Sequence, residues 1–166
     1  NPYYSTYGSG YSLYLGLQKA FETGADEIVF AEGDLYFNED DYQRVCSADK
    51  SVVTVNRNPI LADKSVALYF DIAGEIRYIY DTGHNELLIK EPFFAIYNSG
   101  QVWKFSDKEI AKKVFSKTDK EEWKGTNLIF VEKYFRTIGR DKYELITLGN
   151  WVNCNTLDDF NQIQEY

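Results

Sequence analysis

Two acidic residues flank a glycine directly after a short apolar run. The run, Ile28–Ala31, is rich in β-forming residues without polar alternation, which predicts a strand covered on both faces. It ends in Glu32-Gly33-Asp34. A carboxylate just past the carboxyl end of a buried strand lies where open α/β sheets bind ligands, and Gly33 permits a tight bend and the close approach of a phosphate. The alternative is a polar strand–loop junction without a binding role.

Charge and the scarcity of histidine and cysteine limit the other chemistry. The net charge of −8 argues against non-specific nucleic-acid binding, and a metal ion is the natural way for so acidic a protein to hold a phosphorylated ligand. The single histidine, His84, lies in a turn-like stretch, and Cys46 and Cys154 are far apart, so neither a zinc site nor a Ser-His-Asp triad is expected. We expect reduced thiols in a cytoplasmic protein.

The length of 166 residues suits one domain, residues 1–166, with its own core. No apolar run is long enough to predict a membrane span, and no signal peptide is visible. Because the chain begins at Asn1 and contains no methionine, we expect it to be part of a longer reading frame.

Helices and strands alternate in the first third of the chain. Apolar residues at helical spacing predict a helix over Ser12–Thr23, with Ser9 or Ser12 as its cap and Gly24 at its end. A strand at Glu27–Ala31, a short helix with the acids Glu39, Asp40 and Asp41 in its first turn, and a strand at Ser51–Val55 follow. This alternation is typical of a parallel α/β sheet.

The rest of the chain predicts a mixed sheet and further helices. Two β-rich runs, Val66–Ile72 and Ile76–Tyr80, surround Ala73-Gly74 as in a hairpin. Ser106 and Glu109 have the spacing of a capping box, and the mixed charges of residues 116–124 indicate a solvated connection. Further strands are predicted at Leu87–Lys90, Phe93–Tyr97 and Tyr143–Thr147. Further helices are predicted at Asp107–Phe115, from Thr126 or Asn127 onward, and at Leu157–Gln164 with Thr156 as its cap. Trp103 and Trp151 are predicted to be core residues. The fold class is therefore α/β, with a mixed, largely parallel sheet flanked by helices.

Two segments near the ends of the chain resemble the motifs of one family. The first begins N-P-Y-Y, continues through Tyr11-Ser12-Leu13 and reaches Gly33-Asp34; the second runs from Trp151 through Asn155-Thr156 to Asp159-Phe160. They resemble the GT-A-like nucleotidyltransferases that activate sugar phosphates, phosphocholine or molybdopterin. That family shows N-x-x-Y, S-L-x-x-A and Gly-Asp early, and W-x-x-(I/V)-(D/N)-T-x-E-D-(L/F) near its C-terminus.

The resemblance implies a reaction and a set of site residues. Such enzymes join a phosphate monoester to the α-phosphorus of a nucleoside triphosphate and release pyrophosphate, by in-line displacement with Mg²⁺. Asp34 and Asn155 would be the Mg²⁺ ligands, although Asn155 would equally serve to close a strand and cap the last helix. Ser12 would contact the base or ribose, or simply cap its helix. Glu91, in a Lys-Glu-Pro sequence similar to the family's E-K-P element, would lie near the acceptor sugar.

One family element has no counterpart. Relatives open with a strand and a Gly-rich loop, L-A-A-G-x-G-x-R, which binds the triphosphate. No part of the sequence matches that loop, so we expect residues 1–166 to form the later part of the fold and to be catalytically incomplete. Two alternatives stay open: a non-catalytic α/β module that binds a nucleotide or sugar, and a GT-A glycosyltransferase in which Glu32 takes the first position of a D-x-D motif.

Overall fold

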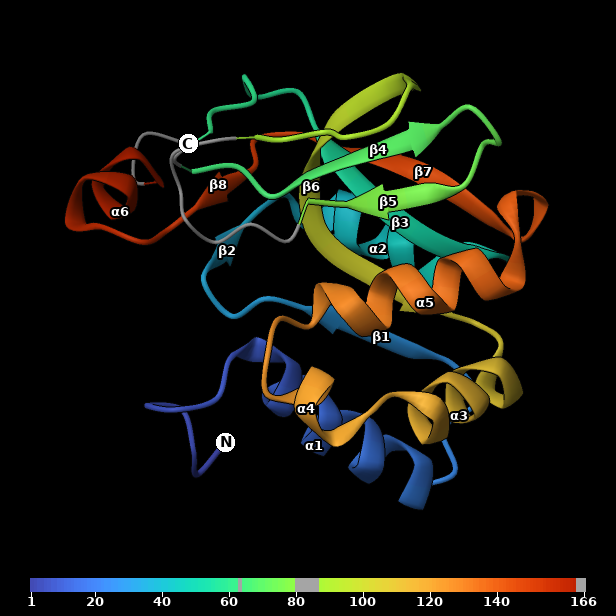
Figure 1. Cartoon of the computed structure of the whole chain (residues 1–166). Helices are drawn as coiled ribbons and strands as arrows, with labels where there is room; N and C mark the ends of the chain where they lie inside the picture. Colours follow the sequence, from blue (N-terminus) through green and yellow to red (C-terminus); the bar gives the residue numbers. More distant parts are fainter. Residues whose placement is uncertain (63, 80–86, 164–166) are drawn as a thin grey trace.

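A six-stranded sheet forms the centre of the molecule (Figure 1). The computed structural model describes residues 1–62, 64–79 and 87–163. The main strand order is β5-β4-β6-β3-β7, and β1 pairs with β6 beside this path. The strands are β1 (Ile28–Ala31), β3 (Ser51–Asn56), β4 (Ala67–Asp71), β5 (Ile76–Tyr78), β6 (Phe93–Phe105) and β7 (Tyr143–Leu148). A separate two-stranded sheet pairs β2 (Leu35–Tyr36) with β8 (Val152–Asn153).

Strand β6 joins the two halves of the main sheet. Its first part pairs with β4, and its last part lies between β1 and β3, so that Trp103 is opposite both Phe30 and Val53. The polar sequence Asn98–Gln101 lies in the middle of this long strand, and the β3–β6 register shifts there. Gln101 has a φ of 56°, and a Cβ on Gly100 would lie 2.4 Å from the Thr54 hydroxyl. Glycine at this position therefore allows β6 to bend against β3.

The mixed α/β fold with flanking helices is confirmed, but the prediction of a largely parallel sheet is wrong. Among the strands that the structure describes, only β3 and β7 pair in parallel, while β1–β6, β3–β6, β4–β5 and β4–β6 are antiparallel. Strands β1 and β3 do run in the same direction, as the alternation of helices and strands predicts. The antiparallel β6, which comes much later in the sequence, lies between them.

Helices cover both faces of the sheet (Figure 1). They are α1 (Ser9–Glu22), α2 (Glu39–Ser47), α3 (Lys108–Lys117), α4 (Lys120–Trp123), α5 (Leu128–Ile138) and α6 (Leu157–Ile163), with a 3₁₀ turn at Arg140–Lys142. The larger core cluster joins α1, α3, α4 and α5 to one face; the smaller one joins α2 to the other. Along β6, Trp103 belongs to the larger cluster and Val102 to the smaller, as the two-residue period of a strand requires.

Most elements predicted from sequence are present within a few residues. The β4–β5 hairpin turns at Gly74 with φ of 78°, and the end of α1 at Gly24 has φ of 76°. Trp103 and Trp151 are core residues, as predicted. The predicted strand at Leu87–Lys90 is wrong because these residues have no regular structure. Tyr80 and His84 lie outside the described residues.

Strand β1 is less buried than predicted. Ile28, Val29 and Phe30 are half-buried, Ala31 is exposed, and β6 is the one strand that pairs with β1 in the described part of the chain. Its side chains do reach both core clusters, Ile28 and Phe30 on one face and Val29 on the other. The strand is therefore covered on both faces but has an open hydrogen-bonding edge.

Two predictions of helix caps are wrong. Neither Ser9 nor Ser12 caps α1; its N-cap is Gly8, whose amide donates to the Lys124 carbonyl at 2.7 Å. Asp107, rather than Ser106, caps α3 and accepts from the Ile110 amide at 2.9 Å.

The predicted solvated connection at residues 116–124 contains the short helix α4. Asp119 and Glu122 form a capping box at its start. Trp123, at its end, is buried in the larger core cluster, and this packing explains why so charged a segment is ordered. Among all described helices, none has the length and apolar composition needed to cross a membrane.

Candidate functional site

The segments that carry Asp34 and Asn155 lie side by side. The amide of Cys154 donates a 2.7 Å hydrogen bond to the Asp34 carbonyl, and the pairing continues with Leu35 opposite Asn153. Asp34 and Asn155 are both exposed, and the side chain of neither makes a hydrogen bond or ion pair within the described residues. The structure thus places the two segments that carry the predicted metal ligands side by side, and neither side chain has another partner among the described residues.

Buried polar contacts hold the second of these segments in position. The Asp41 carboxylate on α2 accepts from the Gly149 amide at 2.6 Å. The Trp151 indole donates to the Gly100 carbonyl at 2.8 Å, and the Asn58 amide group donates to the Trp151 carbonyl at 3.1 Å. The chain from β7 to β8 is therefore fixed by α2, by the bend in β6 and by the loop after β3.

Glu32 connects the end of β1 to helix α5. Its amide donates to the Gln101 carbonyl at 3.2 Å, and its carboxylate accepts a hydrogen bond from the Asn127 side chain. Burial, with a smaller contribution from the nearby charge of Asp34, raises the pKa of Glu32 despite the hydrogen bond from Asn127. The two acids of Glu32-Gly33-Asp34 thus differ, since Glu32 is partly desolvated and bonded while Asp34 is exposed.

Three buried polar atoms on β6 and β8 have no hydrogen-bond partner in the described part of the chain. They are Asn98 Oδ1 and Gln101 Nε2 on the bend of β6 and Asn153 Oδ1 on β8. Gln101 and Asn98 are only 6% and 5% exposed. Because buried polar groups are nearly always bonded, such atoms are expected to meet water or a ligand. Sequence reasoning missed these residues, although the polar run N-S-G-Q inside a β-rich stretch is a signal of a strand interruption.

The acidic residue Asp159 has a structural role. Its carboxylate accepts from the amides of Asn155 and Thr156 and from the Thr156 hydroxyl, and its own amide donates back to that hydroxyl. The Thr156 side chain and then its amide lower the pKa of Asp159. Thr156 caps α6 as predicted, in a capping box that also holds Asn155 at the helix entrance.

Two other predicted ligand contacts have different surroundings. The Ser12 hydroxyl is exposed and accepts from the Asn1 side chain at 3.2 Å. Gly33 is exposed, its φ is outside the left-handed region, and a Cβ there would meet no atom within 4 Å. The backbone therefore does not require glycine at position 33, and the approach of a phosphate stays a prediction.

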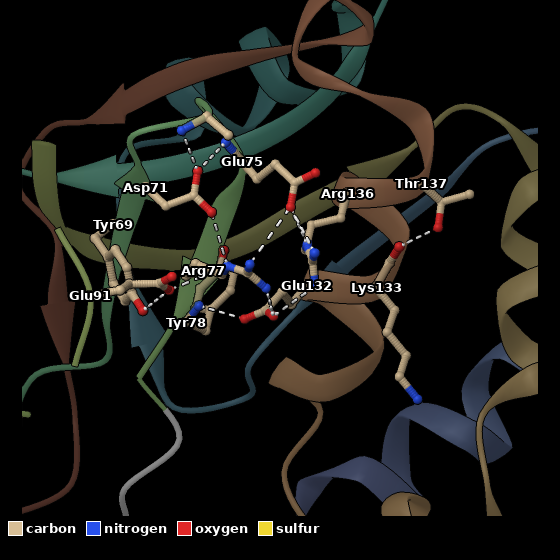
Figure 2. A network of polar contacts seen from close by, with 11 residues as sticks. Tyr69, Asp71, Glu75, Arg77, Tyr78, Glu91, Glu132, Lys133, Arg136 and Thr137 are labelled. Carbon is tan, nitrogen blue, oxygen red and sulfur yellow. Dashed lines mark hydrogen bonds and ion pairs between the residues drawn. The ribbon is translucent and has the colours of Figure 1, made fainter. Parts of the chain in front are cut away.

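Glu91 belongs to another group of charged residues (Figure 2). It accepts from the Tyr69 hydroxyl at 2.9 Å and lies 3.5 Å from Arg77, which also pairs with Asp71 and Glu132. Burial and then Glu91 raise the pKa of Tyr69 to about 12. Glu91 is thus engaged in fastening the β4–β5 hairpin to neighbouring elements, and no contact joins it to Asp34 or Asn155 among the residues described.

The donor set near Asp34 fits a hydrated Mg²⁺ ion. It offers the free carboxylate of Asp34 and the free side-chain amide oxygen of Asn155, both of them oxygen ligands. Mg²⁺ is commonly held by one or two carboxylates, with waters and substrate phosphates completing its shell. Within the described residues no group of three or more His, Cys, Asp or Glu side chains could hold a metal, so a closed all-protein site is not present there.

Comparison of the structure with solved ones identifies the fold. The chain is similar to a Bacillus anthracis protein assigned as a glucose-1-phosphate thymidylyltransferase, with a TM-score of 0.58, 14% identity, and coverage of 92% of this chain and 58% of that one. It is also similar to a nucleoside-diphosphate-sugar pyrophosphorylase from Vibrio cholerae, with a TM-score of 0.51, 16% identity, and coverage of 96% of this chain and 65% of that one. A third similar structure is a mannose-1-phosphate geranyltransferase from Thermus thermophilus, with a TM-score of 0.53, 12% identity, and coverage of 95% of this chain and 55% of that one. The chain shares the fold of these proteins, and it spans less than two thirds of the length of each.

The sequence itself places the chain in a family. Residues 1–166 match the family described as a domain of unknown function, DUF6564, and the chain belongs to it. Among curated proteins, none matches the sequence.

Proposed function

We propose that this chain is the part of a nucleotidyltransferase that holds the metal and the acceptor. The complete protein would join a phosphate monoester, such as a sugar phosphate or phosphocholine, to a nucleoside triphosphate with release of pyrophosphate. The observation that supports the proposal is the 2.7 Å hydrogen bond between the Cys154 amide and the Asp34 carbonyl, because it joins the segments that carry Asp34 and Asn155. The similarity of the fold to sugar-phosphate nucleotidyltransferases supports it.

Each site residue has a role in this proposal. Asp34 and Asn155 hold Mg²⁺. Bound Mg²⁺ would neutralise charge on the phosphates and orient them. Gly33 leaves room for a phosphate beside the chain, and Ser12 contacts the base or ribose. The unpartnered Gln101 amide group, as a donor, suits an oxygen of the bound substrate.

Binding of the triphosphate requires a further element. The family resemblance places it on a Gly-rich loop that follows a strand, and no segment of the 166 residues matches that loop. The open edge of β1 is a suitable position for such a strand, because its backbone groups face no other strand in the described part of the chain. We therefore expect activity in a protein that carries this strand, and little or none in the 166-residue chain.

The test is an assay of pyrophosphate release. Ribonucleoside triphosphates are combined with a panel of sugar phosphates and phosphocholine, in the presence of Mg²⁺. Asp34→Asn in the complete protein should lower turnover by about a hundredfold or more, since metal-ligand charge is worth several kcal/mol in such reactions. Asp158→Asn, on the exposed first turn of α6, is the matched control. Turnover unaffected by Asp34→Asn would contradict the metal site, and strong turnover by the 166-residue chain would show that the triphosphate binds elsewhere.

The surroundings of Glu91 favour a second candidate, a non-catalytic module that binds a nucleotide or sugar. Glu91 is tied to Tyr69 and Arg77, which leaves the predicted acceptor contact already occupied. In that case ligand binding would survive in Asp34→Asn, and no pyrophosphate would be released by the complete protein with any substrate pair.

A further inference from the structure

A basic groove lies between α3, α5 and the β4–β5 turn, away from the site at Asp34. Its volume is about 450 Å³, and its charged lining consists of Lys113, Lys117, Lys133, Arg136 and Glu75. Four cations and one carboxylate meet here in a chain whose net charge is −8. The volume is within the range of small-molecule sites in proteins.

Two of these lysines are free. Lys113 and Lys117 are four residues apart on one face of α3, and both line the groove. Neither ammonium group forms a hydrogen bond or ion pair with any residue that the structure describes. Two like charges one helical turn apart destabilise a helix slightly, and a bound anion would remove that repulsion.

The two cations from α5 are paired with carboxylates. Lys133 lies 2.6 Å from Glu122, and Arg136 lies 2.7 Å from Glu75 and 3.8 Å from Glu132. Figure 2 shows Lys133 and Arg136 on α5, with Arg136 turned toward Glu75. These contacts hold both side chains in place, so their remaining donors are positioned before any ligand arrives.

The lining identifies the kind of ligand. Apart from the charged residues it contains only Val114 and Thr137 among the described residues, so it offers no aromatic ring on which a base or sugar could stack. Lysine ammonium groups bind phosphate oxygens as point charges, and arginine binds them through two parallel donors. We infer that this groove is a binding site for a small anion with two or three linked phosphates, recognised through its phosphates alone. The inference does not depend on the proposed function.

Inorganic pyrophosphate is the probe. Calorimetric titration of the 166-residue chain without divalent metal should show saturable binding that weakens as ionic strength rises toward about 1 M. Amide chemical shifts in NMR spectra should change in α3, α5 and the β4–β5 turn. Absence of binding, or shift changes centred on Asp34 and Asn155 instead, would overturn the inference.

Charge variants locate the site. Replacing Lys113 and Lys117 together by glutamine should weaken binding about tenfold, because each exposed ion pair is worth up to about fivefold in affinity. Lys19→Gln, at an exposed position on α1, is the matched control and should bind as the wild type does. Unchanged affinity in the double variant would overturn the inference. A far-ultraviolet spectrum and melting curve establish that each variant is folded.

Two further experiments test the charge of the ligand and its recognition through phosphates alone. Glu75→Gln should strengthen binding by about two- to fivefold, because it removes the negative charge from the lining. Inorganic triphosphate and a nucleoside triphosphate should bind with similar affinity. A large preference for the nucleotide would contradict recognition through phosphates alone, and weaker binding by Glu75→Gln would contradict a ligand of negative charge.

Discussion

The carboxylate of Asp41 accepts a 2.6 Å hydrogen bond from the main-chain amide of Gly149. Asp41 also accepts from Arg44 at 2.7 Å, and its side chain is 9% exposed. This contact ties the chain between β7 and β8 to helix α2. It therefore fixes the stretch that leads into Asn155.

We predict that Asp41→Ala lowers the free energy of unfolding by about 1–3 kcal/mol, because it leaves the Gly149 amide without its acceptor. Urea denaturation measures the change. Asp40→Ala, at the exposed neighbouring position in the first turn of α2, is the control. Because Asp40 contributes a helix-dipole interaction, its removal should lower the free energy of unfolding by no more than about 0.3–1 kcal/mol. Equal effects at the two positions would show that the contact with Gly149 contributes little.

Lys104 is a buried cation in β6, with 2% of its side chain exposed. Its ammonium group donates to the carbonyls of Cys46 and Ala48 at the end of α2 and pairs with Glu27 at 2.9 Å. Lys104→Met should cost about 2–4 kcal/mol in unfolding free energy, because these carbonyls lose a charged donor.

The control for this prediction is Lys108→Met. Lys108 makes similar contacts, with the Gly24 carbonyl and Asp26, but Asp26 is 95% exposed. Lys108→Met should therefore lower the free energy of unfolding by less than about 1 kcal/mol. Chemical denaturation of both variants gives the comparison, and a smaller loss for Lys104→Met than for Lys108→Met would refute the prediction.

Glu32→Gln should stabilise the protein at neutral pH. Burial raises the pKa of Glu32 in the folded state above its unfolded value, so the ionised group disfavours folding once the pH exceeds the unfolded pKa. Glutamine removes that charge and can still accept from Asn127. The melting temperature of the variant should exceed that of the wild type at neutral pH, and the difference should shrink as the pH falls toward about 4.

Glu144→Gln, at an exposed position of β7, is the matched control for the charge change and should show no such trend. A melting temperature for Glu32→Gln that is lower than that of the wild type at neutral pH would mean that ionised Glu32 stabilises the fold.

Gly33→Ala separates a structural from a ligand-binding role of this glycine. A Cβ at position 33 meets open space, and the φ there suits any residue, so stability should stay the same or rise by about 0.4–1 kcal/mol. If a phosphate approaches the backbone at Gly33, turnover by the complete protein should fall although the fold is intact. A marked loss of stability would contradict the structural part of this account.

The sequence predicts local elements well because their signals are local. Apolar spacing predicts α1 and α5, the β-rich run at Ser51–Val55 predicts β3, and Gly74 predicts the hairpin turn. The position of β6 between β1 and β3 is not predictable in this way, because it depends on a strand that comes much later in the chain. Periodicity carries no information about such pairing.

The residues of the candidate site are likewise predictable only where a local motif marks them. Motifs identify Asp34 and Asn155, and the β2–β8 pairing brings their segments together. Glu91 also occurs in a motif-like sequence, yet its carboxylate is engaged by Tyr69 and Arg77, residues that local patterns do not connect to it. Gln101 has no motif at all, since its burial and its unpartnered amide group result from the bend in β6.

The claim that Asp34 and Asn155 share a divalent cation is tested most directly with Mn²⁺ in place of Mg²⁺. Mn²⁺ broadens NMR signals of nearby nuclei, so titration of the 166-residue chain should first broaden the amides of residues 33–36 and 152–156 and the side-chain amide of Asn155. We expect Asp34→Asn to abolish this local broadening, Asn155→Asp to strengthen it by adding a charge, and Asp158→Asn to leave it unchanged. Broadening that is unchanged in Asp34→Asn, or that centres on the acids of α6, would contradict a shared metal site.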